Sequence, residues 1–497
     1  MIRKISISQI LLLLSLLIYS GITLWVGLFH FEQWRDQAHV WVSVRDGSWW
    51  DLFVTVPAHT HPFLWFFLVK LLVLMGLTYQ SAQVLNILCC ISACALLFLR
   101  SPLPWWFKIA FPFSFPLLYE FAMPGRIYAL GILLSFLICS EFQQRHRRPL
   151  PFCTILALNF HTHFLFLSLC APVLILFVYE SWVNKTLFSK NYIISLIVVI
   201  VSGFYLLWYI TQVGQNAGMI NLGNTKNNIL EIFNLALTVE KTKYVLLILI
   251  TIMGFILIQS RQFKSFFITL FALVFMFYTY HNLVPNFIRY YQILTVILIC
   301  LMWLSILISK EKKSNSTNLI QAEKVKGKKA APKVRLSFWP HIYTATYILF
   351  TSCILISCKA GIANLKNEIS TTHSDSKNAA TFILKNKLLE YILVGHRSYT
   401  VSSIVPYLPK DKQIWYADQQ EFGTYLKFDS LFYKTHLSVS YTQAIQNSQK
   451  KFNHEKKLAL ILSLPIPKEF EANFNLIYAT KSSPIQRDES YFIYVRQ

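Results

Sequence analysis

The chain has 497 residues and a formal net charge of +23, and 55% of its residues are hydrophobic. Its mean hydropathy of +0.46 excludes an ordinary soluble enzyme and indicates a protein that crosses a membrane several times. The basic residues gather in short connections between apolar segments, which is the positive-inside pattern. No basic face with interleaved aromatic residues stands outside those segments, so we expect no nucleic-acid partner.

The first apolar segment, residues 5–29, follows a short basic N-terminus. It is longer than the apolar core of a signal peptide, and no small-residue cleavage site follows it. We therefore predict a first membrane span with a cytoplasmic N-terminus and an external loop over residues 30–80. Residues 62–77 of that loop are apolar but number only about 16, which predicts a juxtamembrane helix that does not cross.

Ten further apolar segments follow, which gives about eleven spans. The pair 151–160 and 164–179 is predicted to hinge at the His-Thr-His of positions 161–163. The nine cysteines lie in apolar segments and are expected to be buried thiols, not disulfides or metal ligands. The predicted spans after the first cover residues 81–99, 105–119, 128–140, 151–160, 164–179, 192–211, 244–259, 266–280, 292–308 and 338–358.

Two segments differ from this apolar pattern. Residues 310–335 are rich in Lys and Arg, which predicts a cytoplasmic loop near anionic lipid. In residues 359–497, short β-rich runs alternate with helical stretches, which predicts a small α/β domain. The β-rich runs cover residues 391–394, 413–417, 458–463, 475–479 and 491–495. We therefore expect a polytopic α-helical membrane protein, with a transmembrane domain over 1–358 and an extracytoplasmic α/β domain over 359–497.

Asp36 is the first candidate for chemistry, because it lies a few residues beyond the first span. A carboxylate at the lipid–water boundary can act as a general base or hold a divalent cation. The alternative is a solvated carboxylate paired with Arg35 or Arg45. His39, His59 and His61 follow in the same loop, but a His-x-His pair alone is weak support for a metal site.

A second polar group lies near the external ends of later spans. Glu120 and Arg126 interrupt an apolar stretch, where charged side chains are costly unless they pair or face water. They form either a structural ion pair or part of a site. Arg289, followed by Tyr290, begins a late span, where a guanidinium can grip a lipid-linked phosphate or anchor the helix at the interface.

The order of these motifs resembles the GT-C glycosyltransferases, membrane enzymes that use polyprenyl-phosphate-linked sugars. The motifs are DQAHVW (36–41), HTHPFLW (59–65), YEFAMPGRIYAL (119–130), NFHTH (159–163) and FIRYY (287–291). They look like the bacterial branch related to protein O-mannosyltransferases and lipid A aminoarabinose transferases. The chain departs from that branch at Asp36-Gln37, where relatives often carry Asp-Glu, and this weakens a two-carboxylate metal site.

The resemblance implies sugar transfer to a glycolipid, glycan or protein at the outer face of a bacterial plasma membrane. It implies that Asp36 is the catalytic residue. It implies no definite cofactor, and a divalent metal cation remains an option. A lipid-linked polysaccharide polymerase or ligase and a transporter or flippase are the alternatives. The other implied roles are acceptor or metal positioning for Glu120, His59 and His61, donor phosphate binding for Arg126, Arg289 and Tyr290, and cavity lining for His39, His161 and His163.

Overall fold

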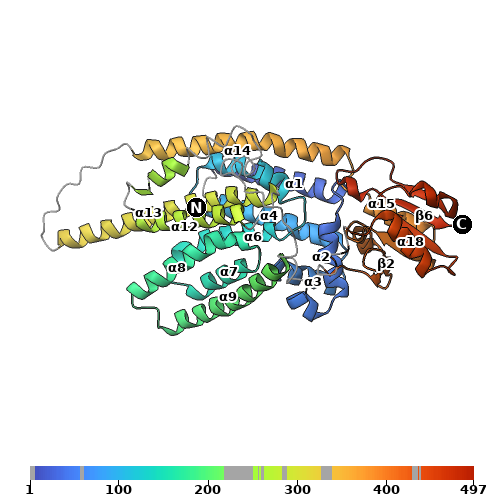
Figure 1. Cartoon of the computed structure of the whole chain (residues 1–497). Coiled ribbons are helices and arrows are strands. Elements are labelled where there is room, and N and C mark those ends of the chain that lie inside the picture. Colours follow the sequence, from blue (N-terminus) through green and yellow to red (C-terminus); the bar gives the residue numbers. More distant parts are fainter. Residues whose placement is uncertain are drawn as a thin grey trace.

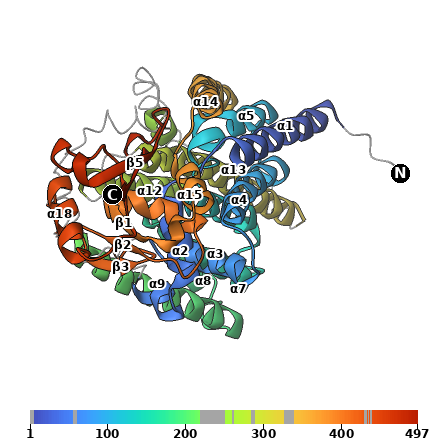
Figure 2. The same cartoon turned by 90° about the vertical axis from the view of Figure 1, so that its right-hand side faces the viewer.

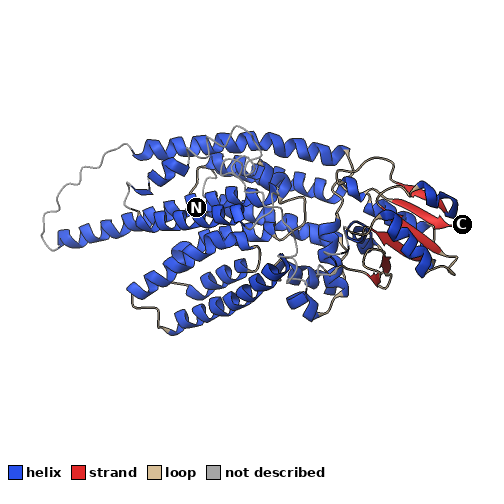
Figure 3. Ribbon diagram, in the orientation of Figure 1, coloured by secondary structure: helices blue, strands red, loops and turns tan. Residues whose placement is uncertain are grey.

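The computed structural model describes residues 6–55, 61–217, 250–255, 257–258, 262–282, 288–325, 339–427, 432, 435 and 438–497. A long helical bundle carries a small mixed sheet at one end (Figure 1; Figure 3). We call this end of the bundle the sheet end. The expected class, a polytopic helical membrane protein with a C-terminal α/β unit, is confirmed.

Within the described residues, seven helices are long and apolar enough to cross a membrane. Many large apolar side chains on them face outward, for example Leu13, Val201 and Phe204, as expected of surfaces that contact lipid. The seven are α1 (Ile7–Phe29), α4 (Gln80–Arg100), α8 (Leu167–Val183, extended by the turn η6, Phe164–Phe166), α9 (Lys190–Ala217), α12 (Phe263–Asn282), α13 (Ile288–Val325) and α14 (Trp339–Ser370).

Helix α13 forms the centre of the bundle. In its most apolar stretch 83% of the residues are buried inside the protein, against 28% for α1 and α9. Its Trp303 and Tyr291 are fully buried. A helix surrounded by protein holds its first turn firmly, and this is relevant because Arg289 lies in that turn.

The predicted span over residues 105–119 is not one helix. It is divided into α5 (Trp105–Ala110), η3 (Phe111–Phe113) and η4 (Pro116–Glu120). Pro112 and Pro116 explain the breaks, because proline lacks the N–H that a continuous helix requires. The next two segments are short helices, α6 (Tyr128–Glu141) and α7 (Pro149–Phe160), while most of the predicted 244–259 span lies outside the described residues.

The loop predicted to be external forms two helices, α2 (Arg35–Asp46) and α3 (Leu64–Leu74), with the short turn η1 (Asp51–Thr55) between them. Helix α3 has 11 residues, too few to cross a bilayer, as the juxtamembrane prediction requires. Lys70 of α3 is buried and donates to the carbonyl oxygens of Val44 and Gly47. It thereby binds the C-terminal carbonyls of α2, where a cation is favourable.

The sheet has the strand order β3-β2-β1-β4-β6-β5. Strand β1 pairs in parallel with β2 and β4, and the two outer pairs, β2–β3 and β6–β5, are antiparallel, as is β4–β6. The elements are α15 (Ser376–Lys385), η7 (Leu388–Glu390), β1 (Ile392–His396), α16 (Ser398–Val401), η8 (Ser402–Tyr407), β2 (Ile414–Tyr416), β3 (Glu421–Gly423), α18 (Tyr441–Lys451), β4 (Leu458–Leu462), η9 (Lys468–Asn473), β5 (Phe474–Ala479), η10 (Arg487–Glu489) and β6 (Phe492–Arg496).

The sheet domain is fastened to the start of α2. The backbone N–H of Arg35 donates to Glu489 Oε1 at 3.0 Å, and the Arg35 guanidinium pairs with Asp488. Turn η8 packs along α2. Figure 2 looks onto the sheet end and shows that the sheet domain covers only part of it, with α1 and α4 beside it. The position of α2 therefore depends on two parts of the sheet domain, η8 and the acidic residues just before β6.

Candidate functional site

Asp36 lies in the first turn of α2, at the sheet end of the bundle. The N-terminus of the helix favours a negative charge there. A capping box sets the turn, because Gln37 Oε1 accepts the backbone N–H of Trp34 at 3.0 Å. The side chain of Asp36 is 37% exposed, so a substrate can reach it.

Two arginines from distant parts of the chain contact Asp36. The Arg126 guanidinium forms an ion pair with Asp36 Oδ2, and Arg289 Nη1 lies 3.6 Å from the same oxygen. Their own side chains are only 11% and 17% exposed. Arg126 also lies over the Trp34 ring, 5.2 Å from its centroid. Two largely buried guanidiniums thus face one accessible carboxylate.

These contacts decide between the alternatives for the charged residues. Asp36 does not pair with Arg35 or Arg45, because Arg35 binds Asp488 and Arg45 binds Asp46 at 2.8 Å. Among the described ion pairs, Arg126 contacts Asp36 instead of Glu120, so the structural Glu–Arg pair is not formed.

Glu120 ends η4 and is partly buried. Burial raises the pKa of its carboxyl to about 7, against the lowering effect of Arg289. Arg289 therefore influences both Asp36 and Glu120. Arg289 also acts on His61. Burial and the charge of Arg289 lower the pKa of the His61 imidazole to about 4. His61 is consequently neutral at pH 7 and can act only as a hydrogen-bonding group.

The histidines are divided among different contacts. The rings of His61 and His163 have centroids 5.4 Å apart, and Tyr128 and Tyr290 lie 5.2 and 5.4 Å from His163. This aromatic cluster adjoins Arg289, because Tyr290 is the next residue. His61, His163 and Tyr290 are therefore brought together on the α13 side of the site.

His39 and His161 make other contacts. His39, on the buried side of α2, lies 3.5 Å from Ser43 Oγ. His161 Nε2 lies 2.6 Å from Ser202 Oγ of α9, and its ring packs against Phe63. This contact joins α7 to α9. His59 lies outside the described residues, and in the part of the chain that is described no three His, Cys, Asp or Glu side chains gather as metal ligands.

Two amides of α4 that the sequence did not single out hold the turn that carries Arg126. Gln83 Nε2 donates to Met123 O at 2.5 Å, and Asn86 Nδ2 donates to Phe121 O at 2.8 Å. A Cβ on Gly125 would lie 2.8 Å from Gln83 Oε1, so a larger residue at this position would require the Gln83 amide to move. The signal in the sequence was two amides three residues apart within an apolar span, which places them on one helix face.

The crystal structure of ArnT from Cupriavidus metallidurans bound to undecaprenyl phosphate superposes on this chain with a TM-score of 0.58. The match covers 97% of each chain, at 12% sequence identity. The chain has the ArnT fold. It is the fold that the GT-C resemblance predicted. No family model matches the sequence, and no curated protein matches it either, so the likeness to ArnT rests on three-dimensional structure.

Proposed function

We propose that this chain transfers a sugar from a polyprenyl-phosphate-linked donor to a membrane or envelope acceptor. The observation that carries the proposal is Asp36 held between the guanidiniums of Arg126 and Arg289. The ArnT fold supports it, because the ArnT structure was solved with undecaprenyl phosphate. The reaction takes place at the outer face of the plasma membrane, with the N-terminus inside and the sheet domain outside.

Charge balance favours this chemistry. Two arginines and one carboxylate leave a net charge of about +1 at the site, which matches a donor phosphodiester with one negative charge. When the bond between the sugar and the phosphate breaks, the departing polyprenyl phosphate takes the bonding electron pair and gains negative charge. The arginines then bind it more strongly than they bind the donor, which is the condition for stabilising a transition state.

The acceptor supplies the nucleophile. Its oxygen or nitrogen attacks the anomeric carbon, the bond to the phosphate oxygen breaks, and the proton of the nucleophile passes to Asp36. A phosphate that engages Arg289 also draws it away from Asp36, which leaves the carboxylate more basic. Glu120 and the neutral His61 are assigned to positioning the acceptor, and Tyr290 and His163 to the wall of the donor site. His39 and His161 are not assigned a catalytic role.

The donor site can be tested by binding. We expect wild-type protein in nanodiscs to bind undecaprenyl phosphate and to discriminate against undecaprenol, which lacks the phosphate. Arg289→Gln should weaken phosphate binding by about tenfold or more, because a hydrogen bond between charged groups is lost. Arg100→Gln, at the exposed end of α4, is the matched control and should bind as the wild type does. Equal binding by Arg289→Gln, or by undecaprenol, contradicts the assignment.

A further inference from the structure

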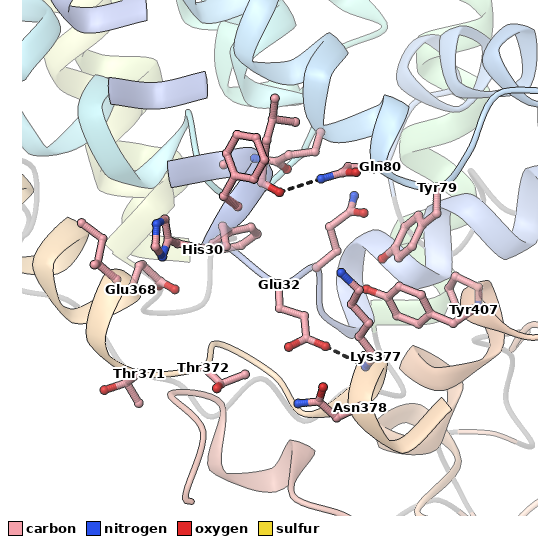
Figure 4. A pocket seen from close by; sticks show the side chains of 18 of the residues that line it. His30, Glu32, Tyr79, Gln80, Glu368, Thr371, Thr372, Lys377, Asn378 and Tyr407 are labelled. Carbon is pink, nitrogen blue, oxygen red and sulfur yellow. Dashed lines mark hydrogen bonds between the residues drawn. The ribbon is translucent and has the colours of Figure 1, made fainter. Parts of the chain in front are cut away.

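Three amide side chains form a polar stripe on one face of α4. Gln80, Gln83 and Asn86 follow one another at intervals of three residues, and this spacing puts them on the same side of the helix. Gln80 Nε2 donates to Leu28 O at 2.8 Å, on the wall of the pocket drawn in Figure 4. The start of α4 is therefore fastened to the end of α1, and α4 is a firm support for the two amides that follow.

Gln83 connects this support to both sides of the candidate site. Its Nε2 donates to Ala122 O and Met123 O, at 3.2 and 2.5 Å, in the turn that carries Arg126. Its Oε1 lies 3.4 Å from Gln37 Nε2 of α2, at the long end of the hydrogen-bond range. Gln83 is fully buried and Gln37 is 2% exposed, so water is not available to replace these bonds.

Gln37 reaches Arg126 by a second route as well. Gln37 Oε1 accepts the backbone N–H of Trp34 at 3.0 Å, and the Trp34 ring lies against the Arg126 guanidinium, 5.2 Å from centroid to carbon. One side chain therefore holds the ring on which the guanidinium packs and, through Gln83, the turn from which Arg126 projects. Asp36 is the neighbour of Gln37 in the first turn of α2, so both members of the ion pair are held at the same point.

Gly125, the residue before Arg126, leaves the space in which the two amides meet. A Cβ there would lie 2.8 Å from Gln83 Oε1 and 3.4 Å from Gln37 Nε2. We propose that Gln37 is a positioning residue that holds the Arg126 guanidinium against Asp36. It acts through Arg126 and not on the substrate. Its effect on sugar transfer rests on the proposed function, whereas its effect on the position of Arg126 does not.

The role of Gln37 requires a side chain that accepts one hydrogen bond and donates another. An amide does both, whereas an ionised carboxylate only accepts. Gln37→Glu therefore keeps the acceptor that caps α2 and loses the donor toward Gln83, so that two acceptor oxygens face each other. A protonated carboxyl can donate again, and burial favours the protonated form. This variant should keep the wild-type arrangement at low pH and lose it as the pH rises.

The ring of Trp34 reports on the guanidinium beside it. The full-length protein in nanodiscs is labelled with fluorotryptophan, and the fluorine NMR resonance of Trp34 is the one missing from Trp34→Phe. Arg126→Gln gives the position of that resonance without a guanidinium against the ring. In Gln37→Glu we expect the wild-type position at about pH 5 and a movement toward the Arg126→Gln position by about pH 8, as the buried carboxyl ionises. The wild type over the same range is the reference.

Two controls isolate the route through Arg126. Gln9 has the same place in the capping box of α1, where its Oε1 accepts the Ser6 N–H at 2.9 Å, and it is exposed. Gln9→Met should leave the Trp34 resonance unchanged. In the double variant Gln37→Glu with Arg126→Gln, the movement with pH should disappear. If it persists there, or if Gln37→Glu gives the wild-type spectrum at every pH, the inference is wrong.

Sugar transfer is measured separately, by complementation of a deletion strain at equal membrane abundance. Gln37→Met, which removes both the acceptor and the donor, should lower the transferred sugar by roughly tenfold or more, because a small misplacement of a catalytic group is costly. Gln9→Met should restore it fully. Full restoration by Gln37→Met contradicts the inference. If the deletion itself changes no glycan, the proposed function fails, and the fluorine spectra still decide whether Gln37 positions Arg126.

Discussion

The end of the bundle far from the sheet contains a buried ion cluster whose loss should destabilise the protein. Arg145 lies between Glu180 of α8 and Glu311 of α13, with its Nε 2.8 Å from Glu180 Oε2. The side chains of Arg145 and Glu180 are only 4% and 5% exposed. Glu180 also binds His146 and Lys264, so it joins three positive or polar partners.

The substitution Glu180→Gln keeps the shape of the side chain and removes its charge. Loss of one partner of a buried ion pair costs about 3–5 kcal/mol. We expect the lower end, about 3 kcal/mol, because Arg145 keeps Glu311 at 2.7 and 3.0 Å. The measurement is the apparent Tm of wild type and variant in detergent, taken from fluorescence-detected size-exclusion chromatography at several salt concentrations. A lower Tm of the variant reports the destabilisation.

A matched substitution controls for the chemistry of the change. Glu390 pairs with Lys457 at 2.6 Å, but both side chains are more than half exposed, so Glu390→Gln should leave the apparent Tm unchanged. High salt should not reproduce the effect of Glu180→Gln, since buried pairs are poorly screened. If both variants melt as the wild type does, the cluster does not hold α8 and α13 together.

Two further substitutions test the packing and the junction with the sheet domain. Gly131→Ala would place a Cβ 2.1 Å from the Phe166 ring and should cost about 1–3 kcal/mol by overpacking, whereas Gly21→Ala, with nothing within 4 Å, should be neutral in thermal melts. Burial raises the pKa of Glu489 to about 7, above its unfolded value near 4.5. Between pH 4.5 and 7 the folded state therefore binds more protons than the unfolded state. The free energy of unfolding then falls by up to about 3 kcal/mol as the pH rises through this range. Glu489→Gln should flatten that part of the plot of Tm against pH.

Features that depend only on the apolar length or the β-propensity of consecutive residues were predicted well from the sequence. Five of the six strands coincide with β-rich runs, and the short apolar stretch 62–77 contains the non-crossing helix α3. The hinge at positions 161–163 separates α7 from α8 as expected. All nine cysteines are free and largely buried. Apolar length and β-propensity are read directly from consecutive residues, which is why these predictions held.

Features that depend on contacts between distant residues could not be predicted. Strand β3 has only three residues, and it is a strand because its backbone pairs with β2. Helix α14 continues to Ser370, beyond the predicted end of the last span at residue 358, and it packs on η4. The ion pairs of Asp36 form because the first turn of α13, with Arg289, and the turn before α6, with Arg126, both lie close to the start of α2, and no local pattern contains these approaches.

The central claim, that Asp36 takes part in sugar transfer, is tested most directly by mass spectrometry of envelope glycolipids and glycans. Three strains are compared: a deletion, the deletion complemented with wild type, and the deletion complemented with Asp36→Asn at equal membrane abundance. We predict that one sugar mass is missing in the deletion, returns with the wild type and stays missing with Asp36→Asn. A full return of that mass with Asp36→Asn, or unchanged glycans in the deletion, would contradict the claim.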